Sequence, residues 1–163
     1  MPKNKEINAV PTPLLSWDIY AMHIYKVARE AQIKMDIEQL NSFRKNFSWA
    51  INFNDILNET YEALVLTDYN QTILWSSKGF YKMTGYSSQF AKGKTPKFLQ
   101  GEKTSAEVKQ QLKRNIYHGK TFSGDLINYR KNGEDYICNI KVHPLKNEKD
   151  EITHFLALER EVF

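Results

Sequence analysis

All seven glycines of this chain lie between Gly79 and Gly133, and the first 78 residues contain none. Glycine weakens helices and permits the backbone conformations that tight turns require. The 163-residue chain therefore has a glycine-free N-terminal part that favours helices and a turn-rich C-terminal body. This division predicts a loose, proline-containing leader over residues 1–13, a helical arm over 14–58 and one folded domain over 59–163.

The helical arm carries two amphipathic stretches without glycine or proline. Apolar side chains recur at helical spacing in both, first at Trp17, Tyr20, Ile24 and Val27, then at Ile37, Leu40, Phe43 and Phe47. Helices of this length need a surface to pack on, because short helices are marginal alone in water. We expect the arm to cover the outer face of a sheet or to build a dimer there.

The body alternates strand-like and helix-like patterns in a definite order. An apolar run over 63–67, polar turn residues and a second run over 72–75 predict a hairpin. Short helices punctuated by glycine follow up to Gly119, and strands are expected over 121–130, 135–145 and 152–161. Because no long crossover helix alternates with the strands, the pattern predicts an α+β fold, a five-stranded antiparallel sheet with short helices on one face.

The loop between the third and fourth strands decides which side chains face the helices. A two-residue loop would align Asn128 with Asn139, whereas a three-residue loop with Gly133 in the left-handed conformation aligns Asn128 with Tyr136 and Cys138. The inner face of a half-buried strand is its apolar one. We therefore predict the three-residue loop, with Cys138 inward as a small hydrophobic side chain.

Composition excludes several classes of protein. Hydrophobic residues make up 41% of the chain, which excludes wholesale disorder, and no apolar run approaches the roughly 18 residues of a membrane span. The single cysteine excludes an internal disulfide and a cysteine-based zinc site, and it predicts a cytoplasmic location. The four histidines lack metal-ligand spacing. We therefore expect no metal site, no membrane association and no enzymatic activity.

Charge is distributed unevenly along the chain. The net charge is +4, yet residues 78–120 hold ten basic and two acidic side chains. A basic segment attracts nucleic acid or other anions, but a solvated helical face gives the same pattern. We adopt the solvated face, so nucleic acid is not an expected partner. A small basic anion- or nucleic-acid-binding protein remains a further alternative.

Four motifs in a fixed order carry a family resemblance. They are GFYKMTGYS at Gly79–Ser87, GKTPKFLQGEKT at Gly93–Thr104, INYRKNGEDY at Ile127–Tyr136 and FLALERE in the last strand. Together they resemble the PAS domain, a small sensory module, and within it the light-oxygen-voltage (LOV) branch. The resemblance covers about residues 59–163 and implies the same α+β fold.

The LOV photosensors bind a flavin and form a covalent bond from a cysteine in the motif G-x-N-C-R-F-L-Q-G. Here Pro96 stands at the cysteine position and Thr95 at the asparagine position. Lys97 and Lys113 match two phosphate-contacting arginines, with charge but without the bidentate fork. The resemblance therefore implies that light-induced adduct chemistry is excluded by Pro96.

The remaining flavin contacts of that branch are matched in part. Gln100 and Asn128 match amide contacts, whereas Cys138 replaces an asparagine and Glu159 a glutamine. With Thr95, these residues form a candidate cofactor-binding pocket. No cofactor is favoured, because unpaired polar groups of a buried flavin would cost roughly 1–3 kcal/mol each, and flavin mononucleotide is the alternative. Glu159 either faces Gln100, Asn128 or a ligand, or lies wet at the strand end.

The sequence thus predicts a non-enzymatic PAS sensory or interaction module. The sequence ends with this domain, so we expect signalling through a homodimer or a separate signalling protein, with a small-molecule ligand between the sheet and the short helices. The alternative is a flavin-binding photoreceptor or redox sensor that forms no cysteine adduct.

Overall fold

The computed structural model describes the backbone of residues 13–163 and the side chains of residues 17–163. The predicted leader over 1–13 therefore lies outside the described residues except for Pro13. One helix, α1 (Pro13–Phe47), joins the two stretches expected in the arm into a single element. The chain divides within this helix, and Gln39–Phe163 forms one compact unit. No described helix combines the length and apolarity needed to cross a bilayer.

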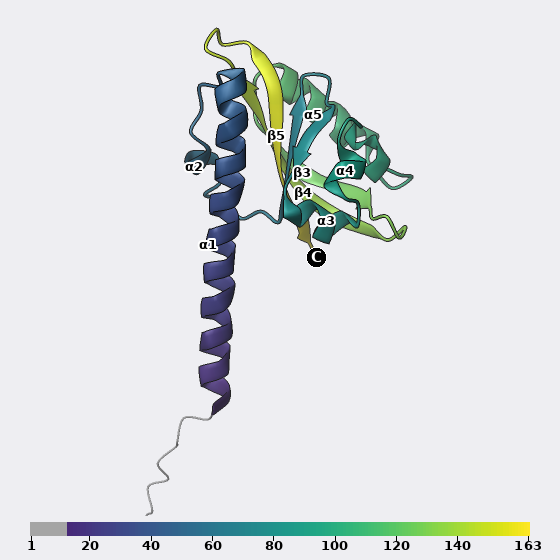
Figure 1. Cartoon of the computed structure of the whole chain (residues 1–163). Helices are drawn as coiled ribbons and strands as arrows, with labels where there is room; N and C mark the ends of the chain where they lie inside the picture. Colours follow the sequence, from purple (N-terminus) through teal and green to yellow (C-terminus); the bar gives the residue numbers. More distant parts are fainter. Residues whose placement is uncertain (1–12) are drawn as a thin grey trace, which may run out of the picture. The chain divides into compact units, whose positions relative to one another are not determined.

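Five strands form one antiparallel sheet in the order β2-β1-β5-β4-β3 (Figure 1). Their bounds are β1 (Ala63–Asp68), β2 (Ile73–Ser76), β3 (Phe122–Tyr129), β4 (Asp135–Lys146) and β5 (Ile152–Val162). Every pairing is antiparallel, and the predicted first hairpin is present as β1 and β2. The predicted α+β class, the element order and the five-stranded sheet are confirmed.

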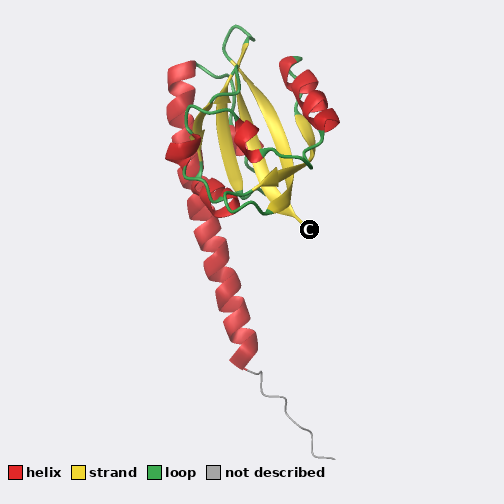
Figure 2. Cartoon of the chain, turned by 90° about the vertical axis from the view of Figure 1, so that its right-hand side faces the viewer, coloured by secondary structure: helices red, strands yellow, loops and turns green. Residues whose placement is uncertain are grey.

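Short helices connect β2 to β3 and lie together on one side of the sheet (Figures 1 and 2). They are α3 (Lys78–Thr84), α4 (Ser88–Ala91), the 3-10 helix η1 (Pro96–Leu99) and α5 (Ala106–Tyr117). Ser105 caps α5 by accepting a hydrogen bond from the Val108 backbone N–H. We call the sheet face beneath these helices the inner face.

The β3–β4 hairpin has the predicted register. Asn128 pairs with Tyr136, and Leu126 pairs with Cys138. Gly133 has a φ of 89° in the three-residue loop, a conformation that glycine adopts without a steric penalty. Cys138 is fully buried within the inner-face core, as expected for a small hydrophobic side chain.

The opposite, outer face of the sheet is covered by the end of α1 and the segment after it. Leu40 is fully buried, and the Phe43 ring lies 6.4 Å from the Trp75 ring of β2. Ser48, with a φ of 52°, ends the helix, and Trp49 then forms an isolated bridge with Asn147. A second short helix, α2 (Phe53–Ile56), follows on the same side (Figure 1).

The expectation that the arm covers the outer face is therefore confirmed for its C-terminal part, from Leu40 onward. In the first unit the side chains of the earlier stripe are exposed, namely Trp17, Tyr20, Ile24 and Val27. A dimer built on that stripe stays a prediction.

Candidate functional site

A cavity of about 90 Å³ lies between the inner face and the helices η1 and α5. By its volume it has room for several water molecules or a small ring. Its walls are largely apolar, and both the sheet and the helix side contribute to them. The sheet contributes Val65, Thr67, Leu126, Asn128, Ile140, Val142, Phe155, Ala157 and Glu159. The helix side contributes Pro96, Leu99, Gln100, Leu112 and Ile116, and the β1–β2 turn contributes Gln71.

Three of the five predicted site residues line this one cavity. Gln100 directly follows η1, Asn128 lies on β3 and Glu159 on β5. The other two lie elsewhere, because Thr95 occupies the N-cap position of η1 and Cys138 packs in the adjacent hydrophobic core. Tertiary packing therefore brings together Gln100, Asn128 and Glu159 from distant parts of the chain.

The loop after η1 fixes Gln100 beside β3. The Thr104 hydroxyl donates to the Ile127 carbonyl at 2.6 Å and accepts from the Gly101 N–H at 2.9 Å. Gly101 lies so close to the Tyr129 ring that a Cβ there would be 2.4 Å from a ring carbon. These contacts require glycine at position 101 and place the preceding amide next to Asn128.

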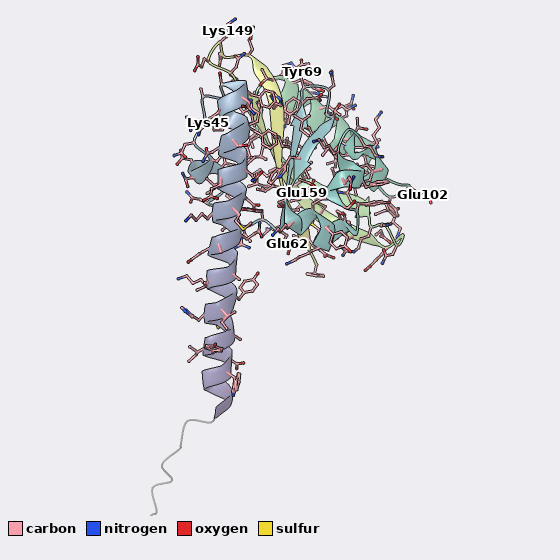
Figure 3. The ribbon with its side chains drawn as sticks, viewed as in Figure 1. Lys45, Glu62, Tyr69, Glu102, Lys149 and Glu159 are labelled. Carbon is pink, nitrogen blue, oxygen red and sulfur yellow. The ribbon has the colours of Figure 1, made fainter. Side chains whose placement is uncertain are left out.

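The Glu159 side chain is 5% exposed, and its Oε2 atom has no hydrogen-bond partner among the described residues. Burial raises the pKa of this carboxyl from 4.5 to about 7. In Figure 3 it lies inside the sheet domain, whereas Glu102 lies on a loop at the edge. The wet strand end, one of the two interpretations left open by the sequence, is therefore wrong for Glu159.

The sequence analysis did not single out a second buried polar group, the hydroxyl of Tyr136. The Tyr136 hydroxyl, on β4, is also buried without a well-formed hydrogen bond among the described residues, and it interacts with the side chain of Asn128. Burial and the nearby Glu159 carboxylate raise its pKa, and the same two causes raise the pKa of the Cys138 thiol. Tyr136 shares the inner register with Cys138, so the alternation along β4 was the available signal.

A second hollow of about 340 Å³ adjoins the cavity, and we call it the mouth. It shares Gln71, Gln100, Leu112 and Leu126 with the cavity lining, and it adds Lys97, Ala106, Lys109, Gln110 and Lys113. The three lysines have no ion-pair partner among the described residues, so the mouth carries uncompensated positive charge. The sequence singled out Lys97 and Lys113. Lys109 lies one turn before Lys113 on α5, so helical spacing places these two side by side, and the fold adds Lys97 of η1.

The described residues contain no cluster of histidine, cysteine, aspartate and glutamate side chains that could hold a metal ion. The polar groups of the cavity are the amides of Gln71, Gln100 and Asn128, the Thr67 hydroxyl and the Glu159 carboxyl, with lysines at the mouth. Such an arrangement binds and orients a small molecule by hydrogen bonds.

A family profile described as a PAS domain matches residues 62–162. The chain belongs to the PAS domain family. This PAS domain is similar to Phototropin-2 of Oryza sativa subsp. japonica, with 32% identity over 111 residues. It is also similar to the nitrogen fixation regulatory protein of Klebsiella oxytoca, with 28% identity over 110 residues.

These similarities concern one part of much longer proteins. They cover 66% and 68% of this chain but 12% of the phototropin and 22% of the nitrogen fixation regulator. Solved LOV domains share the fold. The dark structure of the Aureochrome1 LOV photoreceptor aligns over 69% of this chain and 84% of that one, with a TM-score of 0.64 and 27% identity.

A second solved structure, the LOV domain of a blue-light activated histidine kinase from Erythrobacter litoralis, gives a TM-score of 0.59 at 25% identity. It covers 64% of this chain and 98% of that domain. The resemblance to PAS domains of the LOV-like branch is thereby confirmed, and the chain is a PAS sensory module related to signalling sensors.

Proposed function

We propose that this PAS domain is a non-enzymatic sensor that binds a small molecule in its inner cavity. The observation that carries the proposal is the buried Glu159 carboxyl, whose Oε2 lacks a partner in a cavity that Gln100 and Asn128 also line. Buried polar groups are normally hydrogen-bonded, so a group left without a partner in a cavity calls for a ligand or ordered water.

Native mass spectrometry of the purified full chain tests ligand binding directly. We expect a bound small molecule that is released on denaturation, and we expect Asn128→Ala to reduce its retention. A native mass equal to the chain mass, together with no thermal stabilisation by a metabolite panel, would contradict the proposal.

We propose that the signal leaves the domain through a homodimer or a separate signalling protein. Apolar side chains on the sheet surface support this, because Ile127, Ile137 and Val162 lie in register across β3, β4 and β5. Ile137 is 43% exposed and its neighbours Ile127 and Val162 are half-buried, and adjoining apolar groups that remain accessible mark interaction surfaces. Sedimentation of the full chain, compared with Ile137→Lys, tests the homodimer. A cytoplasmic location, expected from the single cysteine, stays a prediction.

Non-covalent flavin binding is the second candidate function. Gln100 and Asn128, which match flavin contacts in the LOV branch, line the same cavity, and the lysines of the mouth suit a phosphate. The polar groups match those of a flavin site, and a bound flavin would supply an absorbing and redox-active ring. The cavity of about 90 Å³ is smaller than three fused rings, so flavin binding requires the helices to move away from the sheet. These residues do not fit the cysteine adduct, because Pro96 lines the cavity and carries no thiol.

An absorption spectrum after reconstitution with flavin mononucleotide and gel filtration distinguishes the two candidates. Flavin retained in equal amount to the protein, and released by Asn128→Ala, would establish flavin as the ligand. A colourless protein that still holds another small molecule would leave the general sensor function in place. In either case we expect no light-induced cysteine adduct.

A further inference from the structure

The segment that holds α3, α4 and η1 carries positive charge without compensation. Residues 78–99 include five lysines and no aspartate or glutamate. All five lysines are exposed, and none belongs to an ion pair among the described residues. At the adjacent end of the β3–β4 hairpin, Glu134 already pairs with Arg130. Asp135 likewise pairs with Lys103.

An aromatic cluster lies within this charged segment. Tyr86 follows α3, Phe90 belongs to α4 and Phe98 belongs to η1. The Tyr86 and Phe90 rings stack with their centroids 4.9 Å apart, and the Phe98 ring meets both in T-shaped geometry at 5.0 and 5.4 Å. Phe90 is 42% exposed. The cluster therefore presents accessible apolar surface on the side of the sheet where α3 and α4 lie (Figure 1).

Lysines from three elements lie around the cluster. The Lys94 Nζ atom lies 4.4 Å from the centroid of the Phe90 ring and donates to the Phe90 carbonyl at 2.9 Å. Lys131, in the β3–β4 loop, lies beside Gly85, where an added Cβ would be 3.3 Å from the Lys131 Cβ. Lys82 lies in the last turn of α3. We call these lysines and the three rings the basic aromatic patch: Lys82, Tyr86, Phe90, Lys94, Phe98 and Lys131.

The patch has the composition of a protein interface, with apolar rings at its centre and charged groups around them. Its charge is complementary to carboxylates, and such complementarity gives specificity and rapid association. Nucleic acid is also negative, but single-stranded bases bind by stacking on free ring faces. Tyr86 and Phe90 use ring faces on each other, and Lys94 lies over the Phe90 ring. The patch therefore favours an acidic protein segment over nucleic acid.

We propose that the basic aromatic patch docks an acidic segment of a separate signalling protein. An apolar side chain of that segment packs on the aromatic cluster, and its carboxylates lie beside Lys82, Lys94 and Lys131. The inference rests on the proposed function in one respect, since it gives the chemistry of the partner through which the signal leaves the domain. It requires neither a ligand in the inner cavity nor a homodimer.

Synthetic peptides test the acidic and the apolar parts of the partner separately. The probe is a peptide in which glutamates flank two leucines and a central phenylalanine. One control peptide has glutamine in place of each glutamate, and the other has serine in place of each apolar residue. Isothermal titration calorimetry with the full chain measures the affinities, and backbone amide shifts in NMR spectra locate the contact. We expect the probe to bind at least about tenfold more tightly than either control, with shifts centred on Phe90.

Two double variants with the same change in net charge separate the patch from the overall charge of the protein. Lys94→Gln/Lys131→Gln should weaken binding of the probe about fivefold, because two charge pairs are lost. Lys45→Gln/Lys149→Gln removes two exposed lysines at the end of α1 and in the β4–β5 loop, and it should bind like the wild-type protein (Figure 3). A rise in salt concentration should weaken binding to the wild-type protein.

Variants of Phe90 test the apolar centre of the patch. Phe90→Ser removes the most exposed ring of the cluster and should weaken binding of the probe at least about fivefold. Phe90→Leu keeps an apolar side chain and should retain most of the affinity. Thermal melts of every variant check that it is folded.

Several results would overturn the proposal. They are equal binding of the probe and its glutamine control, equal losses in the two double variants, and no binding of the probe at about 1 mM. Tighter binding of single-stranded DNA, or of phosphatidylcholine vesicles that contain phosphatidylserine, would also overturn it, because the partner would then be a nucleic acid or a membrane. The proposed sensor function survives these outcomes if native mass spectrometry finds a bound small molecule, and it fails separately if none is found.

Discussion

The two faces of the sheet are packed in different ways. On the outer face, Leu66 and Leu156 are fully buried beneath the end of α1, from Leu40 onward, and the segment that follows it. In that segment the Trp49 indole N–H donates to Thr153 and His154. The outer face beneath these residues is therefore closely packed and its polar groups near Trp49 are paired, although His143 Nε2 has no partner among the described residues.

On the inner face, a cavity separates the sheet from η1 and α5. The inner face combines a packed core around Phe80 and Cys138 with a cavity and two buried polar atoms without partners, on Glu159 and Tyr136.

The two kinds of packing have different effects on the stability of the domain. Close packing contributes stability, because dispersion contacts and apolar burial both increase with packing density. A cavity with unpaired polar groups costs stability in the absence of a ligand, and a ligand that fills it restores the lost interactions. The outer face and the packed core around Phe80 both stabilise the domain, whereas the cavity of the inner face is the binding site under the proposed function.

Truncating one leucine on each face tests that difference most strongly. Leu156→Ala removes a fully buried side chain of the outer face and should lower the free energy of unfolding by about 3–5 kcal/mol. Leu126→Ala should cost only about 2 kcal/mol, since this side chain already faces the cavity and the mouth and therefore has fewer packing contacts to lose. Urea denaturation measures both, and equal losses would contradict the comparison.

The pH dependence of stability tests how much the buried Glu159 carboxyl lowers the free energy of unfolding. Its pKa is raised in the folded protein, so the folded state holds a proton that the unfolded state loses as the pH rises from 4.5 to 7. Stability should therefore fall across that range and the full cost should be present above pH 7. Glu159→Gln removes the cost and should be more stable than the wild-type protein at pH 8, by up to about 3 kcal/mol.

Thermal melts of both proteins at pH 4.5 and pH 8 provide the measurement. The two should approach each other at the lower pH, where the wild-type carboxyl is neutral in the folded state and half protonated in the unfolded state. A variant that is less stable than the wild-type protein at pH 8 would show that Glu159 already has a favourable partner.

A smaller effect is expected for the paired polar groups of the outer face. Trp49→Phe removes the N–H that donates to Thr153 Oγ1 at 3.1 Å and to His154 Nδ1 at 3.2 Å. The loss should be about 1 kcal/mol at neutral pH, where burial lowers the pKa of His154 and keeps its ring neutral. Trp75→Phe is the matched control, and a similar loss there would mean that ring size rather than hydrogen bonding matters.

The last prediction compares the reactivity of the Cys138 thiol in the folded and the unfolded protein, a measurement that leaves the stability of the protein unchanged. Cys138 is fully buried on the inner face, and burial raises the pKa of its thiol. A thiol probe should react at least about tenfold more slowly with the folded protein than with the unfolded one. The double variant Ile137→Cys/Cys138→Ala places the thiol on the exposed neighbour and should react rapidly in the folded state. Rapid reaction of native Cys138 would mean that the inner face opens readily.

Much of the sheet could be predicted from the sequence because its determinants are local. The alternation of Tyr136 and Cys138 with polar residues, together with Gly133 in the loop, set the register of the β3–β4 hairpin. The continuity of α1 was less visible, since the two apolar stretches lie on different stripes of one helix. Where the helix ends depends on Ser48 and on the packing of Trp49 against β5.

The sequence predicted individual candidate residues, but it did not predict which of them line one cavity. Motif resemblance singled out Gln100, Asn128 and Glu159, and it gave equal weight to Thr95 and Cys138, which do not line the cavity. Whether a side chain lines a cavity depends on how η1 and α5 pack over the sheet. That packing is a long-range property, which the spacing of residues along the chain does not encode.

The sequence by itself determined the order of the elements, the face on which Cys138 lies and the lack of a thiol at Pro96, since each follows from residue type and spacing. Tertiary structure decided that Glu159 Oε2 is buried without a partner and that Lys97 of η1 lies at the mouth with Lys109 and Lys113 of α5. The physical reason is that burial and electrostatic environment are set by neighbours far away in the chain, whereas strand alternation and turn conformation are set by neighbours close in sequence.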